Sequence, residues 1–175
     1  MIHKLHIYTG DGKGKTTAAM GLAVRSLGHG NKVLIAQFMK NNTSGELIAL
    51  ASFRNAIILS APPVSGFSFR MTDQERVRTA AEQTAFAREV TERICMEQPD
   101  TIILDELNYA VHISMVDPDI ATALIDTALR FGETVSTGRN APQMLLDRAD
   151  YISRIVAERH PYGTEKLHAR KGVEW

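Results

Sequence analysis

A glycine-rich loop between an apolar strand and a helix constrains this sequence more than any other feature. The loop occupies residues 9–17, TGDGKGKTT, and follows an apolar run at residues 5–8. Apolar residues at helical spacing continue beyond it to about Gly28, which predicts a strand–loop–helix unit. Such a loop points backbone N–H groups at phosphate oxygens, and the helix N-terminus adds its dipole. The sequence therefore predicts a loop that binds the phosphates of a nucleotide.

The residue types in this loop suit different tasks. We expect the three glycines to adopt positive φ and to let the backbone approach a ligand closely. Lys15 would reach the β- and γ-phosphates, and the Thr16 hydroxyl would be a ligand of Mg²⁺. The usual spacing has a glycine where this sequence has Thr9, so the loop is a variant, and a connecting turn with an incidental lysine is the alternative. The predicted nucleotide-binding residues here are Gly10, Asp11, Gly12, Lys13, Gly14, Lys15, Thr16 and Thr17.

Six short apolar runs predict strands, and helical patterns lie between most of them. The runs are residues 5–8, 33–38, 56–59, 101–104, 134–137 and 151–156. This alternation predicts an α/β fold with a parallel sheet, helices on both faces and ligands at the carboxyl ends of the strands. Capping residues start one long helix at 72–75, which runs toward Gln98, and another at 117–119, which ends near Gly132. We expect one P-loop NTPase-like domain over residues 1–175, because the chain is too short for two.

Composition excludes several classes of partner. The 20 basic and 20 acidic residues cancel, which argues against nucleic acid or an anionic membrane as the main partner. The sequence has no long apolar span and no signal-like start, so we expect no membrane segment and a cytoplasmic location. Cys95 is the single cysteine, and its neighbours predict a structural thiol on the buried face of a helix.

A second motif, residues 101–108, is an apolar strand that ends in Asp105 and Glu106. A phosphate-loop protein needs an acidic group at this place to hold Mg²⁺, which Mn²⁺ could replace. The predicted metal site is therefore Thr16, Asp105 and Glu106, and the sequence does not decide which carboxylate lies nearer the metal. Solvated acids at a strand end are the alternative for both. Glu106 could also activate water, which would make the protein an ordinary NTPase.

These two motifs and four others, in order, resemble the ATP:corrinoid adenosyltransferases. The resemblance implies transfer of the 5′-deoxyadenosyl group of ATP to the Co(I) of a reduced corrinoid such as cob(I)alamin, with release of tripolyphosphate, in cobalamin biosynthesis or salvage. ATP and the reduced corrinoid would be the substrates. The motifs span nearly the whole sequence and are TGDGKGKTT at 9–17, QFMK at 37–40, GFSF at 66–69, LDELN at 104–108, TGR at 137–139 and ARKGVEW at 169–175.

The resemblance also implies roles outside the loop. Lys13 and Lys40 would add positive charge near the triphosphate, although Lys40 could equally be a solvated loop lysine. Phe67 and Phe69 match an aromatic pair beside the corrinoid, and core packing is the alternative for both; the family commonly has tryptophan at the second position. Arg139 would hold a phosphate, a ribose or a corrin amide, or would cap the next helix at the surface.

We expect Lys15, Thr16 and Glu106 to be the catalytic residues. Two other functions stay open from the sequence: an ATPase or kinase that cleaves at the γ-phosphorus, and a nucleotide- or corrinoid-binding carrier that consumes no ATP. By resemblance, the partners would be a second copy in a homodimer and a flavoprotein reductase. Some family members cover the site with an N-terminal extension that is not present in this sequence, so either the sequence is trimmed at its start, or a partner subunit or a corrinoid-facing loop excludes water.

Overall fold

A sheet of six parallel strands forms the centre of the computed structural model, which describes residues 3–40, 44–64, 71–159, 161 and 169–173. The strand order is β3-β2-β4-β5-β1-β6, and neighbouring strands are parallel throughout. The predicted parallel sheet is confirmed, and each predicted strand agrees with an observed one to within two residues. The strands are β1 (Leu5–Thr9), β2 (Val33–Gln37), β3 (Ala56–Ser60), β4 (Thr101–Asp105), β5 (Glu133–Thr137) and β6 (Tyr151–Arg154).

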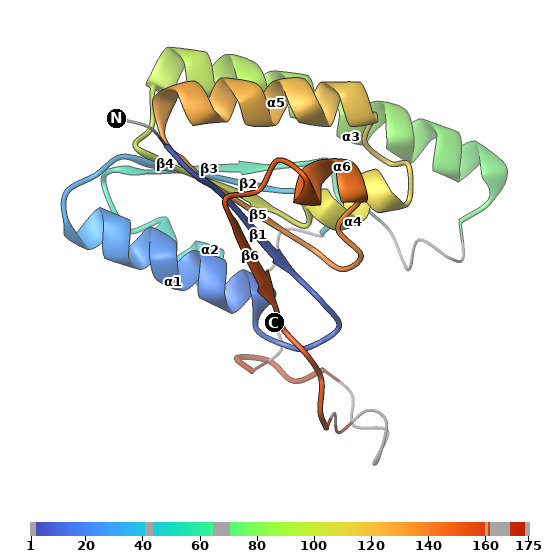
Figure 1. The fold of residues 1–175 in the computed structure, drawn as a ribbon, viewed down its shortest axis with the longest axis horizontal. Helices are drawn as coiled ribbons and strands as arrows, with labels where there is room; N and C mark the ends of the chain where they lie inside the picture. Colours follow the sequence, from blue (N-terminus) through green and yellow to red (C-terminus); the bar gives the residue numbers. More distant parts are fainter. Residues whose placement is uncertain (1–2, 41–43, 65–70, 160, 162–168, 174–175) are drawn as a thin grey trace.

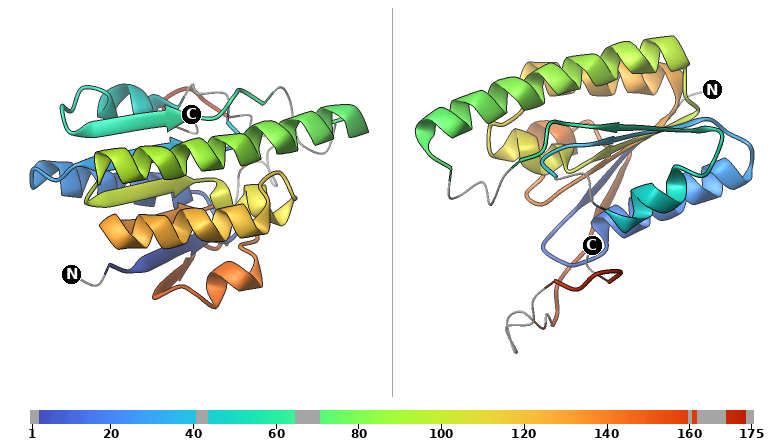
Figure 2. Two further views of the ribbon diagram at one scale, coloured as in Figure 1. Left: turned by 90° about the horizontal axis from the view of Figure 1, so that it is seen from above. Right: turned by 180° about the vertical axis from the view of Figure 1, so that it is seen from behind.

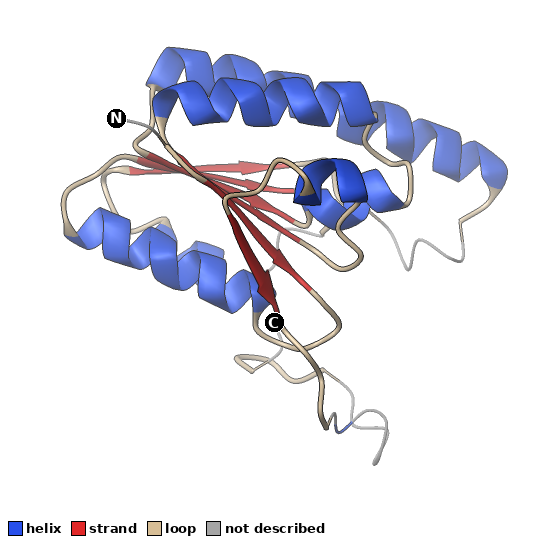
Figure 3. Ribbon diagram, in the orientation of Figure 1, coloured by secondary structure: helices blue, strands red, loops and turns tan. Residues whose placement is uncertain are grey.

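Helices cover both faces of this sheet (Figure 1 and Figure 3). One face carries α1 (Lys15–Gly28) and α2 (Gly45–Leu50); the other carries α3 (Asp73–Glu97), α4 (Leu107–His112), α5 (Pro118–Phe131) and α6 (Gln143–Leu146). Figure 2 shows α3 and α5 side by side above the strands. Helices α2, α4 and α6 were not predicted, because six residues or fewer are too short to show a helical period. Within the described residues, no helix combines the length and apolarity needed to cross a bilayer.

Capping side chains fix where the two predicted long helices begin. The Thr72 side chain accepts a hydrogen bond from the Glu75 N–H, and the Glu75 carboxylate accepts one from the Thr72 N–H, which completes a capping box for α3. The Asp117 carboxylate caps α5 by accepting from the N–H groups of Asp119 and Ile120. Both helix starts therefore agree with the sequence prediction.

An apolar core lies on each side of the sheet. Leu34 and Leu104 pack in the core under α3 and α5, whereas Ile35 and Ile103, next to them in the same strands, pack in the core under α1. Because β2 and β4 are buried on both faces, their sequences are continuous apolar runs rather than alternating ones. The sheet is thus held rigidly at its centre, and its carboxyl edge can position polar side chains.

Cys95 is exposed, so the prediction of a buried thiol is wrong. The buried stripe of α3 includes Phe86, Val90 and Ile94. Successive residues are rotated by about 100° around a helix, so the residue after Ile94 turns out of the stripe. The helix around Cys95 was predicted correctly, but the helical phase assigned to this residue was not.

Candidate active site

The carboxyl edge of the sheet brings together side chains from four segments of the chain. The predicted phosphate loop joins β1 to α1 and supplies Lys15 and Thr16, and Asp105 ends β4. Strands β2 and β5 flank β4, so Gln37 and Thr137 at their ends lie beside Asp105. The two motifs that suggested a magnesium nucleotide site therefore meet in space.

The phosphate loop is shaped as much by its contact with the chain after β6 as by backbone conformation. Gly10 and Gly14 have φ of +103° and +117°, as predicted, but Gly12 does not adopt positive φ, which corrects the prediction for that residue. A Cβ at Gly12 would lie 2.8 Å from the carbonyl group of Val156, and one at Gly10 only 2.3 Å from the Ile155 oxygen. Gly12 is therefore needed because a side chain at this position would collide with the chain after β6. The close approach also lets the Gly12 N–H donate to the Ile155 oxygen at 2.9 Å.

Thr9 replaces the usual first glycine of the loop and has a structural contact of its own. Its side chain is only 2% exposed, and its hydroxyl accepts a hydrogen bond from the Ala141 N–H at 3.2 Å. This bond joins the end of β1 to the segment that follows β5. The departure from the usual loop thus holds two neighbouring segments of the site together.

The Lys15 ammonium lies within the phosphate loop. The residue is 7% exposed, and its Nζ donates to the Gly12 carbonyl oxygen at 2.7 Å. Burial lowers the pKa of Lys15 and the positive charge of Arg139 lowers it further, while the negative charges of Glu106 and Asp11 oppose both effects. Arg139 and Asp11 are thus close enough to act electrostatically on the loop, although both side chains are exposed.

The Asp105 carboxylate is fully buried and accepts four hydrogen bonds. Its Oδ1 accepts from Thr16 Oγ1 at 2.9 Å and Thr137 Oγ1 at 2.7 Å, and its Oδ2 accepts from Gln37 Nε2 at 2.9 Å and Lys40 Nζ at 2.6 Å. Burial alone would raise the pKa of Asp105, but the Lys40 charge and the donors around the carboxylate outweigh burial and hold the pKa below its ordinary value. Asp105 is therefore ionised and has a donor on every side.

Lys40 is held in this position by its backbone. The preceding residue, Met39, has a φ of +52°, in the left-handed region that non-glycine residues seldom adopt. The Met39 N–H donates to the side-chain oxygen of Gln83, a buried residue of α3, at 3.1 Å. Lys40 is consequently part of the site, and the reading of it as a solvated loop lysine is wrong.

Glu106 differs from Asp105 in its contacts. Its φ is +64° and its N–H donates to Thr137 Oγ1 at 3.0 Å, which fixes the backbone just before α4. No hydrogen bond to the Glu106 carboxylate is found within the described part of the chain. Burial raises the pKa of Glu106, and the neighbouring Asp105 charge raises it further, against the opposing effect of the nearby cations. Glu106 is thus the acidic group with free acceptor capacity.

Several residues that hold the candidate site together were not assigned a role from the sequence. Gln37, Gln83 and Thr137 contact Asp105 or the residue before Lys40, and buried Asn108 joins α4 to β5 by exchanging hydrogen bonds with Ser136. The signal available for Gln37 was a polar residue at the end of an otherwise apolar strand, whereas Thr137 ends a strand that is mostly polar and had no such signal. Gln83 had no comparable signal, because it lies in the middle of a mostly polar helix.

The remaining predicted residues lie at the rim of the site or outside the described residues. Lys13 and Thr17 are exposed in the loop and at the start of α1. Phe67 and Phe69 belong to residues 65–70, which are outside the described residues, so the aromatic pair stays a prediction.

The donors at this edge fit a magnesium ion. Thr16 Oγ1 and Asp105 Oδ1 lie 2.9 Å apart, the Glu106 carboxylate is adjacent in sequence, and hydroxyl and carboxylate oxygens are ligands that Mg²⁺ prefers. Among the described residues there is no cluster of three or more histidine, cysteine or acidic side chains that could hold a metal without a nucleotide.

Comparisons with known proteins agree with the geometry. A family model described as ATP:corrinoid adenosyltransferase BtuR/CobO/CobP matches residues 3–175. A corrinoid adenosyltransferase of Pseudomonas aeruginosa is 30% identical over 172 residues, which cover 98% of this chain and 83% of that protein. One of Escherichia coli K12 is 30% identical over 174 residues, covering 97% and 84%. The flagellar accessory protein FlaH of Methanocaldococcus jannaschii has a similar fold, with a TM-score of 0.56 at 14% identity, covering 86% of this chain and 70% of that one.

Proposed function

Since the chain belongs to the ATP:corrinoid adenosyltransferase family and acts in cobalamin metabolism, we propose that its corrinoid substrate carries Co(I) and that tripolyphosphate is its second product. One observation carries the proposal at the level of the site. The phosphate loop and the acidic strand end are joined by the hydrogen bond from Thr16 to Asp105, so a triphosphate and its counter-ion would be held at one place.

The reaction makes little use of acidic and basic side chains for proton transfer. The electron pair of Co(I) attacks the ribose C5′, the C5′–O bond breaks, and its electrons leave on the oxygen of the triphosphate. Because the cobalt is the nucleophile, the reaction needs no water-activating base. The protein must align C5′ with the cobalt and neutralise the departing triphosphate. Lys15 and the N–H groups of the phosphate loop suit the second task.

We propose Thr16 and Glu106 as protein ligands of Mg²⁺, or of Mn²⁺ in its place, with Asp105 supporting Thr16 from behind. The Glu106 carboxylate has free acceptor capacity, whereas each oxygen of Asp105 already accepts two hydrogen bonds. When bound, the metal would offset negative charge on the leaving triphosphate. Lys15 and the phosphate loop would orient the triphosphate for this neutralisation.

The finer assignments are also proposals. Arg139 and Lys13 would contact phosphate or corrin groups at the rim, and Phe67 and Phe69 would lie beside the corrinoid. We further propose one domain over residues 1–175, a homodimer, a flavoprotein that supplies the electron for Co(II), and a cytoplasmic location. The family resemblance supports the dimer and the reductase.

The test is an anaerobic incubation of the purified protein with Mg²⁺, ATP and chemically reduced cob(I)alamin. We expect the visible spectrum of adenosylcobalamin and one tripolyphosphate for each cobalt–carbon bond. Release of orthophosphate without corrinoid and without a cobalt–carbon bond would contradict the proposal and indicate an ordinary NTPase. Repeating the assay with cob(I)yrinic acid a,c-diamide and comparing kcat/KM would identify the preferred corrinoid.

A further inference from the structure

The Lys40 ammonium lies where a metal ion would contact the protein. Its Nζ is 2.6 Å from Asp105 Oδ2 and 3.2 Å from Thr16 Oγ1, so one cationic group contacts both of these predicted metal-site residues. An ammonium is a compact charge with three donors, and it can satisfy two oxygen acceptors at once. Lys40 therefore supplies positive charge to the oxygens that would otherwise face a metal.

The directions of the hydrogen bonds at Thr16 explain why Lys40 and a metal ion would compete for the same oxygen atom. The Thr16 hydroxyl donates its single proton to Asp105 Oδ1, so the oxygen contacts other groups only through its lone pairs. Lys40 donates to that oxygen, and a metal ligated by Thr16 would need the same lone-pair side. Electrostatic repulsion between the Lys40 ammonium and a divalent cation that shares the Thr16 oxygen also opposes the binding of both at this place.

Among the four donors to Asp105, Lys40 is the one that can leave. Gln37 and Thr137 are buried at strand ends, and Thr16 is anchored in the first turn of α1. The Lys40 side chain is 27% exposed, so its end can move while the backbone stays fixed by Met39. A buried carboxylate that loses its ion-pair partner is strongly destabilised, so the departure of Lys40 requires another cation to arrive.

We propose that Lys40 acts as a built-in counter-ion at the metal position, which it occupies in the nucleotide-free protein and yields when the metal–nucleotide complex binds. The bare metal then competes poorly with Lys40, whereas the metal–nucleotide complex brings phosphate oxygens that give the displaced ammonium a new partner. Metal loading is thereby coupled to nucleotide binding. This inference rests on the proposed function for the identity of the metal site.

The test measures Mn²⁺ binding to the nucleotide-free protein by the loss of the free-ion signal in electron paramagnetic resonance. Lys40→Met removes the charge and keeps the chain length, and we expect it to bind Mn²⁺ at least about tenfold more tightly than the unmodified protein. Lys40→Arg keeps the charge and should bind Mn²⁺ as weakly as the unmodified protein does. Lys32→Met is the matched control, because Lys32 precedes β2 and Lys40 follows it.

Equal Mn²⁺ affinity in the unmodified protein and in Lys40→Met would overturn the proposal. So would tight binding that survives addition of Glu106→Gln to Lys40→Met, since the ion would then lie away from the proposed carboxylate ligand. If Lys40→Met unfolds in metal-free buffer, thermal unfolding with Mn²⁺ decides: recovery of the melting temperature supports the proposal, and no recovery contradicts it. The assay uses neither ATP nor corrinoid, so its outcome is independent of the adenosyl-transfer experiment.

Discussion

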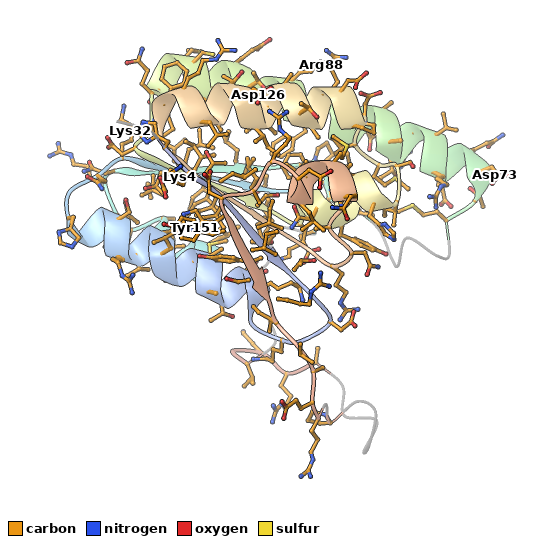
Figure 4. All side chains as sticks on the ribbon, in the orientation of Figure 1. Lys4, Lys32, Asp73, Arg88, Asp126 and Tyr151 are labelled. Atoms are coloured by element: carbon orange, nitrogen blue, oxygen red, sulfur yellow. The ribbon has the colours of Figure 1, made fainter. Side chains whose placement is uncertain are left out.

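Both ends of the sheet contain buried polar groups, but among the residues that the structure describes only the carboxyl end buries charged side chains, Lys15 and Asp105. There, ionised Asp105 is enclosed by Lys40 and hydroxyl and amide donors. At the amino end, the buried pair is neutral: Ser26 Oγ and Thr101 Oγ1 share a hydrogen bond of 2.8 Å. Charged side chains such as Lys32, labelled in Figure 4, lie at the surface of that end.

The backbone shows the same contrast. Three non-glycine residues with positive φ, Met39, Glu106 and Asn140, follow β2, β4 and β5 at the carboxyl end. Such conformations cost about 1–3 kcal/mol each and persist where surrounding contacts enforce them. At the amino end Gln98 adopts positive φ, but it ends a helix, which is an ordinary place for that conformation. Strain and buried charge therefore gather where a ligand is expected, while the opposite end provides stability.

Removing the positive charge of Lys15 from the phosphate loop should give the largest effect, a loss of activity. We expect Lys15→Ala to lower the rate of adenosyl transfer by about 10²–10³-fold, because the leaving triphosphate loses a buried cation. Single-turnover kinetics with saturating ATP measures this change. Lys32→Ala, at the opposite end of the sheet, should keep full activity. Equal losses in the two variants would remove the functional distinction between the ends.

The next largest effect should be a loss of folding stability in the Asp105→Asn variant. The new amide would point an N–H₂ group at side chains that are themselves donors and would leave Lys40 without its charge partner, at a cost of about 3–5 kcal/mol. Urea unfolding measures the free energy of unfolding of the variant and of the unmodified protein. The matched variant is Asp100→Asn just before the same strand, where the carboxylate is exposed and accepts from the Lys32 N–H. A similar loss in both would show that burial of charge is not the decisive difference.

A smaller loss of stability, without loss of activity, should follow Ser26→Ala. The hydroxyl of Thr101 and the amide of Asn31 would each lose a partner, at a cost of about 1–3 kcal/mol. Urea unfolding and the transferase assay on the same preparation separate the two effects. A fall in kcat with unchanged stability would contradict the assignment of the amino end to stability.

The smallest expected effect is the pH dependence of the pair between Lys4 and Asp150. The hydrogen bond from the Lys4 side chain, together with the Leu5 N–H, holds the pKa of Asp150 below its ordinary value. A lowered carboxyl pKa adds stability above the unfolded value of about 3.9, and this stability is lost as pH falls through the folded pKa. Asp150→Asn should therefore be slightly less stable at neutral pH, and the difference should vanish in acid. Urea unfolding at several pH values tests this; a difference that grows in acid would have the wrong sign.

The sequence predicted the strands and the phosphate loop because both depend on local pattern. Central strands buried on two faces give unbroken apolar runs, and a glycine-rich loop with lysine is distinctive in such a context. The shell around Asp105 was not predictable in the same way. Gln37 and Thr137 reach Asp105 only because β2 and β5 flank β4, and that order belongs to the topology rather than to any one segment. The burial of Cys95 was predicted wrongly for a different reason. An error of one residue in the helical phase moves a side chain from the buried face of the helix to the exposed face.

The contact between the phosphate loop and the chain after β6 has a consequence for biosynthesis. Gly10 and Gly12 sit against Ile155 and Val156, and backbone hydrogen bonds tie Ile155 to both Thr9 and Gly12. The loop follows the first strand of the sheet, and the segment that braces it follows β6, so five strands are synthesised between them. A nascent chain thus carries the nucleotide-binding motif well before it has the segment that shapes the loop, and we expect nucleotide binding only after β6 and the residues that follow it have been synthesised.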